Sequence, residues 1–109
     1  YSPAMHDRIT SYISHVPHVI AAALVNLARN ADSANGIFKS LAAGGFKDIT
    51  RIASSNPVVW EHILLSNPKN VVNGLKEYID LINQIITERR CCHQQLLRLF
   101  KGIQRFNPE

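Results

Sequence analysis

The chain has very little cysteine, the residue that marks disulfide-bonded secreted proteins and many structural zinc sites. Its 109 residues include only two cysteines, adjacent at Cys91 and Cys92. Neighbouring residues of a helix point in different directions, so this pair does not form an ordinary disulfide, and a reducing cytoplasm is expected. His15 and His18 have a spacing possible for metal ligands, but structural zinc needs four ligands and catalytic zinc three. We therefore expect no metal site.

Long apolar runs and processing signals are also lacking. The longest apolar run, Val19 to Leu27, is interrupted by Asn26, and a bilayer requires about 20 apolar residues. The N-terminus has none of the charged, apolar and cleavable parts of a signal peptide. We expect no membrane partner. Because the sequence begins with Tyr1 and not with methionine, we expect it to be a fragment of a longer polypeptide.

Neither a dinucleotide fingerprint of the GxGxxG type nor a P-loop occurs, so we expect this chain to bind no nucleotide cofactor by itself. The net charge of +4 favours anionic partners in general. A basic group near the C-terminus lacks interleaved aromatic residues and any recognition-helix motif, which favours the solvated side of an amphipathic helix over nucleic-acid binding. Its members are Arg89, Arg90, Arg98, Lys101 and Arg105.

No run of strict alternation typical of strands occurs, so the sequence predicts an all-α fold, as one helical domain over residues 1–109. A helical pattern runs from Asp7 to about Arg29, and Pro17 within it predicts a kink or a break. Asn30 to Gly36 is typical of a loop. A short helix from Ile37 to about Ala43 is expected to end at the Gly44–Gly45 pair.

Two further helix starts are indicated by asparagine followed by proline. Asn56 and Asn67 are each predicted to cap a helix, the first over Pro57 to Ser66 and the second from Pro68 onward. The second carries a heptad stripe, formed by Val71, Leu75, Tyr78, Ile82, Ile85, Cys92, Leu96, Leu99 and Ile103.

A continuous helix with this stripe would be long compared with its domain. About 38 residues give a helix of about 57 Å, whereas a compact chain of this size has a radius of gyration of about 13 Å. The long C-terminal helix would therefore overhang its own domain, and its apolar stripe would need a second surface. We expect a dimer.

Two polar clusters interrupt the apolar helices. In the first, Ser14, His15 and His18 share a helix face near the carbonyl freed by Pro17. They could bind a hydroxyl or carboxylate of a ligand. Alternatively, Ser14 caps the kinked backbone and the histidines are satisfied within the protein.

In the second cluster, Arg51 is suited to grip a carboxylate with two parallel hydrogen bonds, and Asp48 one turn earlier could orient it. The alternative is a surface ion pair between Asp48 and Arg51. Gly44 allows close backbone approach to a ligand or ends a helix. Trp60, the single tryptophan, is most often a core or interface anchor.

Taken together, these motifs resemble the C-terminal helical domain of prephenate dehydrogenase. The order and spacing match from about residue 6 to residue 85, and several motifs in the right order are far more specific than any one of them. The residues that carry the resemblance are His6, Asp7, Ser14 to His18, Ala42 to Ala53, Pro57 and Trp60.

The resemblance implies a parent enzyme in which a dinucleotide-binding domain of the Rossmann type precedes this region. Such an enzyme oxidatively decarboxylates prephenate to 4-hydroxyphenylpyruvate with NAD or NADP, in tyrosine biosynthesis, and the helical domain supplies the homodimer interface and part of the substrate pocket. The fragment alone is then expected to be inactive. Arogenate is an alternative substrate, and tyrosine is a possible inhibitor. A stand-alone helical interaction module is the alternative from another class.

The resemblance also implies roles for individual residues. Arg51 would bind the substrate carboxylate, Ser14, His15 and His18 would line the pocket, and the Gly44 region would offer backbone contacts. Trp60 and Asp48 would form the wall of the site and support the interface.

Overall fold

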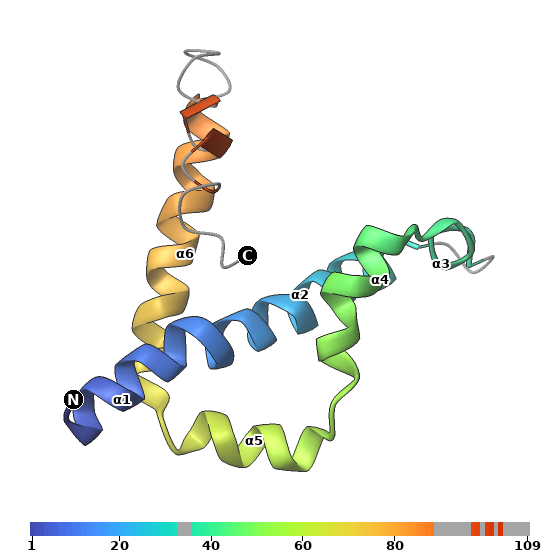
Figure 1. Cartoon of the computed structure of the whole chain (residues 1–109). Helices are drawn as coiled ribbons and strands as arrows, with labels where there is room; N and C mark the ends of the chain where they lie inside the picture. The colour runs from blue at the N-terminus through green and yellow to red at the C-terminus, as the bar shows by residue number, and fades with distance from the viewer. Residues whose placement is uncertain (33–35, 89–96, 99, 102, 104–109) are drawn as a thin grey trace. The chain divides into compact units, whose positions relative to one another are not determined.

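The computed structural model describes residues 1–32, 36–88, 97, 98, 100, 101 and 103. These residues contain helices and their connections and no strand, which confirms the all-α prediction (Figure 1). The chain divides into two compact units, Tyr1–Gly74 and Leu75–Glu109, each described by itself below. The expectation of a single domain over residues 1–109 stays a prediction.

The first unit begins with three helical segments that follow one another directly. They are α1 (Pro3–Thr10), the π-helical segment η1 (Ser11–His15) and α2 (Val16–Ala31). The helix starts earlier than the predicted Asp7 because Ser2 accepts a hydrogen bond from the Met5 backbone N–H at 3.2 Å and Pro3 occupies the first turn.

Pro17 disturbs this helix through a π-helical turn and not through a break. The Val16 N–H donates to the Ser11 carbonyl, one residue further back than in an α-helix. Pro17 follows at the start of α2, where its missing N–H is tolerated. The wider turn carries Ser14 and His15, so the proline shapes the part of the helix that holds the first polar cluster.

The next segments are α3 (Ile37–Leu41), α4 (Gly44–Thr50) and the 3-10 helix η2 (Arg51–Ser54). The prediction that the Gly44–Gly45 pair ends a helix is wrong. Ala42 and Ala43 are extended, so α3 already ends at Leu41 and Gly44 starts α4. α4 and η2 pack against α2.

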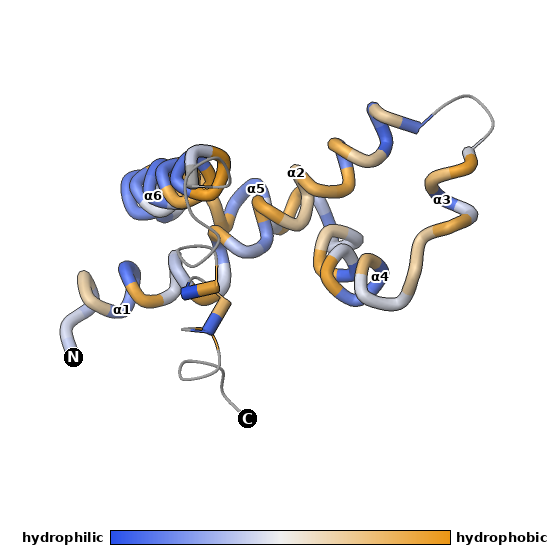
Figure 2. Tube along the Cα trace, turned by 90° about the horizontal axis from the view of Figure 1, so that it is seen from above, coloured by the Kyte–Doolittle hydropathy of each residue, from blue (hydrophilic) through white to orange (hydrophobic). Residues whose placement is uncertain are grey.

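The prolines at 57 and 68 begin helices as predicted: α5 (Pro57–Leu65) and α6 (Pro68–Glu88). Asn56 caps α5, since its Oδ1 accepts from the Val58 and Val59 N–H groups at 2.9 and 3.3 Å. α5 runs back beside α2 (Figure 1). Apolar residues dominate both α2 and α5, as Figure 2 shows.

The first turns of α6 pack closely against the N-terminal helix within the first unit. Val16, Ala21 and Val71 form the buried apolar core among the described residues. A Cβ added at Gly74 would lie 2.7 Å from Cγ2 of Val16, so only glycine permits this approach.

Within the second unit, α6 is amphipathic, with polar residues along one side (Figure 2). Tyr78 and Ile82 of its heptad stripe are each 37% exposed in the single chain, and Ile79 and Ile86, which widen the stripe, are 55% and 51% exposed. Leu97, Arg98, Phe100, Lys101 and Ile103 are also helical. The predicted continuation through residues 89–96, with Cys91 and Cys92, lies outside the described residues.

By length and composition alone, the helix from Pro3 to Ala31 could cross a membrane. Only 22% of its apolar window is buried inside this chain, and the helix buries the polar residues Ser11, His15 and His18.

Candidate functional site

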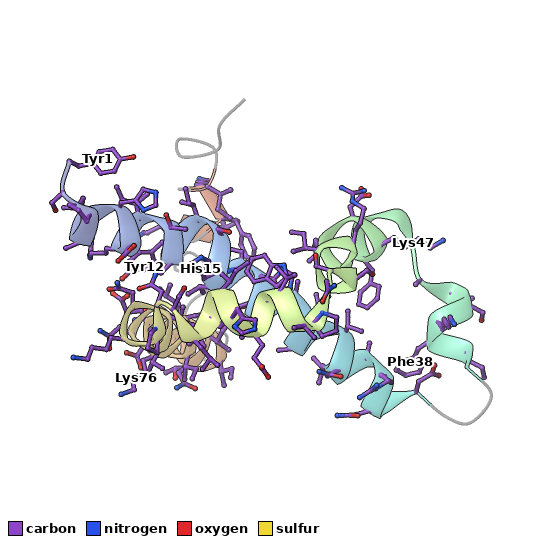
Figure 3. The ribbon with its side chains drawn as sticks, turned by 90° about the horizontal axis from the view of Figure 1, so that it is seen from below. Tyr1, Tyr12, His15, Phe38, Lys47 and Lys76 are labelled. Atoms are coloured by element: carbon purple, nitrogen blue, oxygen red, sulfur yellow. The ribbon has the colours of Figure 1, made fainter. Side chains whose placement is uncertain are left out.

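Three aromatic rings from two helices form the centre of the candidate site. The imidazole of His18 lies parallel to the indole of Trp60, with ring centroids 3.6 Å apart and planes within 5°. The His15 ring meets the same indole edge-on, at 6.1 Å and 85°. The two histidines share a face of the N-terminal helix, and both contact Trp60 of α5. Figure 3 shows His15 on the N-terminal helix, next to α5.

Burial sets the protonation of His18. The residue is only 6% exposed, and its Nδ1 has no hydrogen-bond partner among the described residues. Desolvation lowers the pKa of His18 below its usual 6.5, because a buried cation loses hydration. Near neutral pH the ring is therefore uncharged, and Nδ1 keeps an unused hydrogen-bonding capacity.

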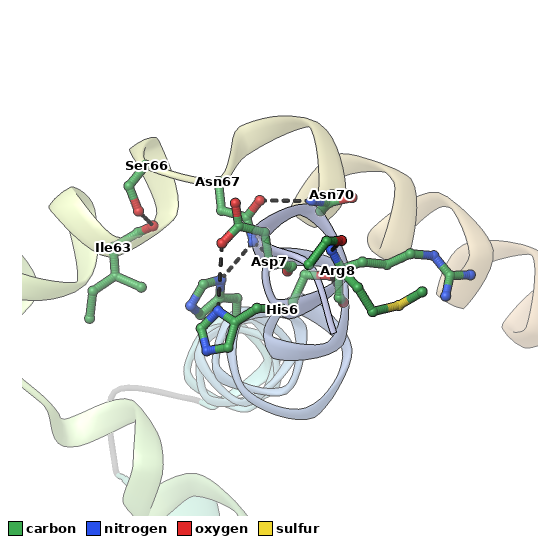
Figure 4. A network of polar contacts seen from close by, with 11 residues as sticks. His6, Asp7, Arg8, Ile63, Ser66, Asn67 and Asn70 are labelled. Atoms are coloured by element: carbon green, nitrogen blue, oxygen red, sulfur yellow. Dashed lines mark hydrogen bonds and ion pairs between the residues drawn. The ribbon is translucent and has the colours of Figure 1, made fainter.

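Asn67 joins His15 to the beginning of the chain. Its Nδ2 donates to the Asp7 carbonyl at 2.8 Å and lies 3.4 Å from Nδ1 of His15. Its Oδ1 accepts from Nδ2 of Asn70 at 2.9 Å (Figure 4). The sequence predicted that the Asn67 side chain caps α6, but its Oδ1 accepts from the Asn70 side chain and not from a backbone N–H of the first turn. The Asn67 backbone carbonyl accepts from the Val71 N–H.

The sequence analysis did not identify Asn67 as part of the site. An asparagine before a proline is the ordinary signature of a helix start, and nothing local shows that residue 67 reaches residues 7 and 15. Ser11 was also missed: it is fully buried, and its hydroxyl donates to the Arg8 carbonyl at 2.7 Å. Ser14, which was predicted to line the pocket, is half-buried on the π-helical turn.

Arg51 is placed apart from the histidines. It begins η2 and pairs with Asp48 at 3.3 Å, with side chains 77% and 73% exposed. No hydrogen bond, ion pair or ring contact between described residues joins Arg51 to His15 or His18. The single chain thus shows the surface ion pair that was the alternative interpretation, and the anion-binding role stays a prediction.

Gly44 lies exposed at the first position of α4. A Cβ built there would meet nothing within 4 Å, so close approach within this chain does not require glycine at 44. Its predicted backbone contact with a ligand stays a prediction.

The described residues contain no group of three or more metal-ligating side chains. The prediction that this chain binds no nucleotide cofactor by itself rests on the missing glycine-rich fingerprint and stays a prediction. The ring cluster suits a small ligand that packs against an indole and exchanges hydrogen bonds with the buried imidazoles.

Comparison with known proteins places this chain in a family. The model of the family "Prephenate dehydrogenase, dimerization domain" matches residues 2–105. The chain belongs to this prephenate dehydrogenase dimerization-domain family.

Individual relatives agree with the family assignment. Prephenate dehydrogenase of Bacillus subtilis is 46% identical over 86 residues, covering 79% of this chain and 23% of the relative. A crystal structure of prephenate dehydrogenase from A. aeolicus, in complex with hydroxyphenyl propionate and NAD+, has a TM-score of 0.86 at 31% identity. The matched region covers 95% of this chain and 37% of the A. aeolicus chain.

Arogenate dehydrogenase of Synechocystis is similar to the same extent. Its crystal structure has a TM-score of 0.85 at 28% identity. The matched region covers 95% of this chain and 38% of the Synechocystis chain. The chain spans about a quarter of the length of the curated relatives that it matches.

Proposed function

We propose that this chain is the substrate-binding and dimerisation part of a prephenate dehydrogenase. Such an enzyme oxidatively decarboxylates prephenate to 4-hydroxyphenylpyruvate in tyrosine biosynthesis, in the cytoplasm, with NAD+ or NADP+ as hydride acceptor. The observation that carries the proposal is the family match over residues 2–105. The solved relative bound to hydroxyphenyl propionate and NAD+ supports it.

In this proposal the ring cluster holds the ring of the substrate. The indole of Trp60 offers an apolar face, and the buried imidazoles of His15 and His18 offer hydrogen bonds that water does not compete for. Ser14, on the same turn as His15, adds a hydroxyl. These groups fix the orientation of a ring that carries carboxylate and hydroxyl groups.

Arg51 would bind a substrate carboxylate, with the Gly44 region adding backbone contacts. Its present partner, Asp48, is exposed, and exposed ion pairs contribute only about 0–1 kcal/mol. Exchanging Asp48 for a substrate carboxylate therefore costs little, and the guanidinium could hold that carboxylate with two parallel hydrogen bonds. Asp48 and Trp60 would support the site from the interface side.

The exposed apolar stripe of α6, with Ile82 and the flanking Ile79 and Ile86, would pair with a second copy of the chain. The hydride acceptor would be held by a part of the enzyme outside this chain, since the sequence has no glycine-rich dinucleotide fingerprint. Arogenate in place of prephenate, and tyrosine as an inhibitor, are compatible with the same pocket chemistry.

The test is a spectrophotometric assay of the complete protein that carries this chain. Purified protein is mixed with prephenate and either NAD+ or NADP+, and with arogenate in parallel, and reduced nicotinamide and 4-hydroxyphenylpyruvate are measured. We expect turnover of prephenate with at least one cofactor. Turnover of arogenate alone would show that arogenate, and not prephenate, is the substrate. Turnover of neither compound would refute the proposed dehydrogenase activity and favour the stand-alone interaction module.

A second measurement tests dimerisation. Sedimentation equilibrium of the 109-residue chain is expected to give twice its mass of 12.2 kDa. A monomer at all concentrations would contradict the pairing of the α6 stripe.

A further inference from the structure

We infer that Asn67 is a positioning residue that holds His15 in the tautomer with its hydrogen on Nε2. His15 then presents a hydrogen-bond donor at Nε2 and not an acceptor. The use of this donor by a substrate rests on the proposed function, whereas the tautomer itself is a property of the folded chain.

The orientation of the Asn67 amide is determined by its neighbours. The Asp7 carbonyl is a backbone oxygen and can only accept, so the amide atom 2.8 Å from it must be the nitrogen. The opposite amide atom then faces Nδ2 of Asn70 at 2.9 Å as an acceptor, which agrees with this orientation. The hydrogen-bond network therefore leaves one arrangement of the Asn67 side chain.

This arrangement determines which nitrogen of His15 is protonated. One hydrogen of Asn67 Nδ2 goes to the Asp7 carbonyl, and the other is available to Nδ1 of His15 at 3.4 Å. A nitrogen that receives a hydrogen bond must keep its lone pair, so Nδ1 carries no hydrogen. In a neutral imidazole the hydrogen is then on Nε2.

Burial protects the contact between Asn67 and His15 from competition by water. Asn67 is 8% exposed and His15 is 9% exposed, so water does not readily replace either partner. The edge-on contact with Trp60 limits rotation of the same imidazole. Donors of this kind recognise oxygen atoms, so in the proposed enzyme His15 Nε2 would donate to a carboxylate, hydroxyl or carbonyl oxygen of the substrate.

The contrast with His18 separates the two histidines by role. His18 Nδ1 has no partner among the described residues, so nothing equivalent to Asn67 selects its tautomer. The inference therefore applies to His15 alone and predicts different behaviour for two residues on the same helix face.

The experiment is nitrogen NMR of the complete protein labelled with ¹⁵N-histidine at neutral pH, with His15 assigned by comparison with a His15→Gln sample. In the wild-type protein we expect the coupling pattern of a ring protonated on Nε2. Asn67→Ala is expected to give a mixture of the two tautomers at His15. Asn70→Ala, which leaves the Asp7 and His15 contacts in place, is the matched control and should keep the Nε2–H pattern.

A His15 ring protonated on Nδ1 in the wild type would overturn the inference, and so would an unchanged pattern in folded Asn67→Ala protein. The wild-type spectrum decides the tautomer even if the variant does not fold. For the role in substrate binding, kcat/KM for prephenate should fall about tenfold in Asn67→Ala and remain near wild type in Asn70→Ala. An Nε2–H ring in a protein inactive on prephenate would leave the tautomer standing and refute only the proposed function.

Discussion

His18 lies flat on the indole of Trp60, with ring centroids 3.6 Å apart. This stack joins the N-terminal helix to α5, two elements whose backbones run beside each other (Figure 1). It also removes the imidazole from water, which explains why the pKa of His18 is lowered. One contact thus supports the first unit and sets the charge of a proposed substrate-binding group.

The first prediction concerns acid stability. The folded-state pKa of His18 lies below its unfolded value of 6.5, so below that pH the unfolded chain takes up a proton that the folded chain resists. The contribution of His18 is therefore fully present above pH 6.5 and is lost as the pH falls below it. Urea unfolding between about pH 7.5 and about pH 5.5 should show a steeper loss in wild type than in His18→Gln.

The control for this prediction is His6→Gln, since the His6 side chain is 60% exposed. It should keep the wild-type slope. Equal slopes in wild type and His18→Gln would contradict the burial argument.

The second prediction concerns Trp60. Trp60→Leu removes the stack on His18 and part of the packing, and should lower the free energy of unfolding by about 1–3 kcal/mol. Val58→Ala, in the same helix but 64% exposed, is the control and should change it by less than about 0.5 kcal/mol. Circular dichroism during thermal unfolding measures both. Equal effects would show that Trp60 is not an anchor.

The third prediction concerns the close approach at Gly74. Gly74→Ala places a Cβ 2.7 Å from buried Val16, and should destabilise the chain by about 1–2 kcal/mol despite the better helix propensity of alanine. Gly45→Ala, with nothing within 4 Å, should be neutral or stabilising. In a Val16→Ala background the cost of Gly74→Ala should disappear. If Gly74→Ala still destabilises the Val16→Ala protein, the added Cβ does not act through a clash with Val16.

The fourth prediction concerns Arg51 in the complete protein. Because Arg51 and Asp48 form an exposed pair, Arg51→Ala should change the free energy of unfolding by less than about 1 kcal/mol. Loss of a charged hydrogen bond to a carboxylate, about 1.5–3 kcal/mol, should raise the KM for prephenate about 10- to 100-fold. Lys47→Ala, a neighbouring exposed cation, is the control. An unchanged KM would remove Arg51 from the substrate role.

Local chemistry made the helix starts predictable. Asn56 with Pro57, and Pro68, begin helices in the structure as expected, since caps and first-turn prolines act within a few residues of the chain. The glycine pair at 44 and 45 misled the same reasoning. Glycine permits a helix end without requiring one, and the two extended alanines before it already end α3.

The sequence by itself determined the all-α fold, the helix starts at Pro57 and Pro68, and the presence of two histidines on one helix face next to a proline. These features depend on residue spacing and on backbone chemistry within a turn or two. Only the tertiary structure decided that Trp60 covers His18 and that Asn67 reaches His15, 52 residues away in the chain. Such pairings arise from the packing of whole helices, so no local pattern encodes them.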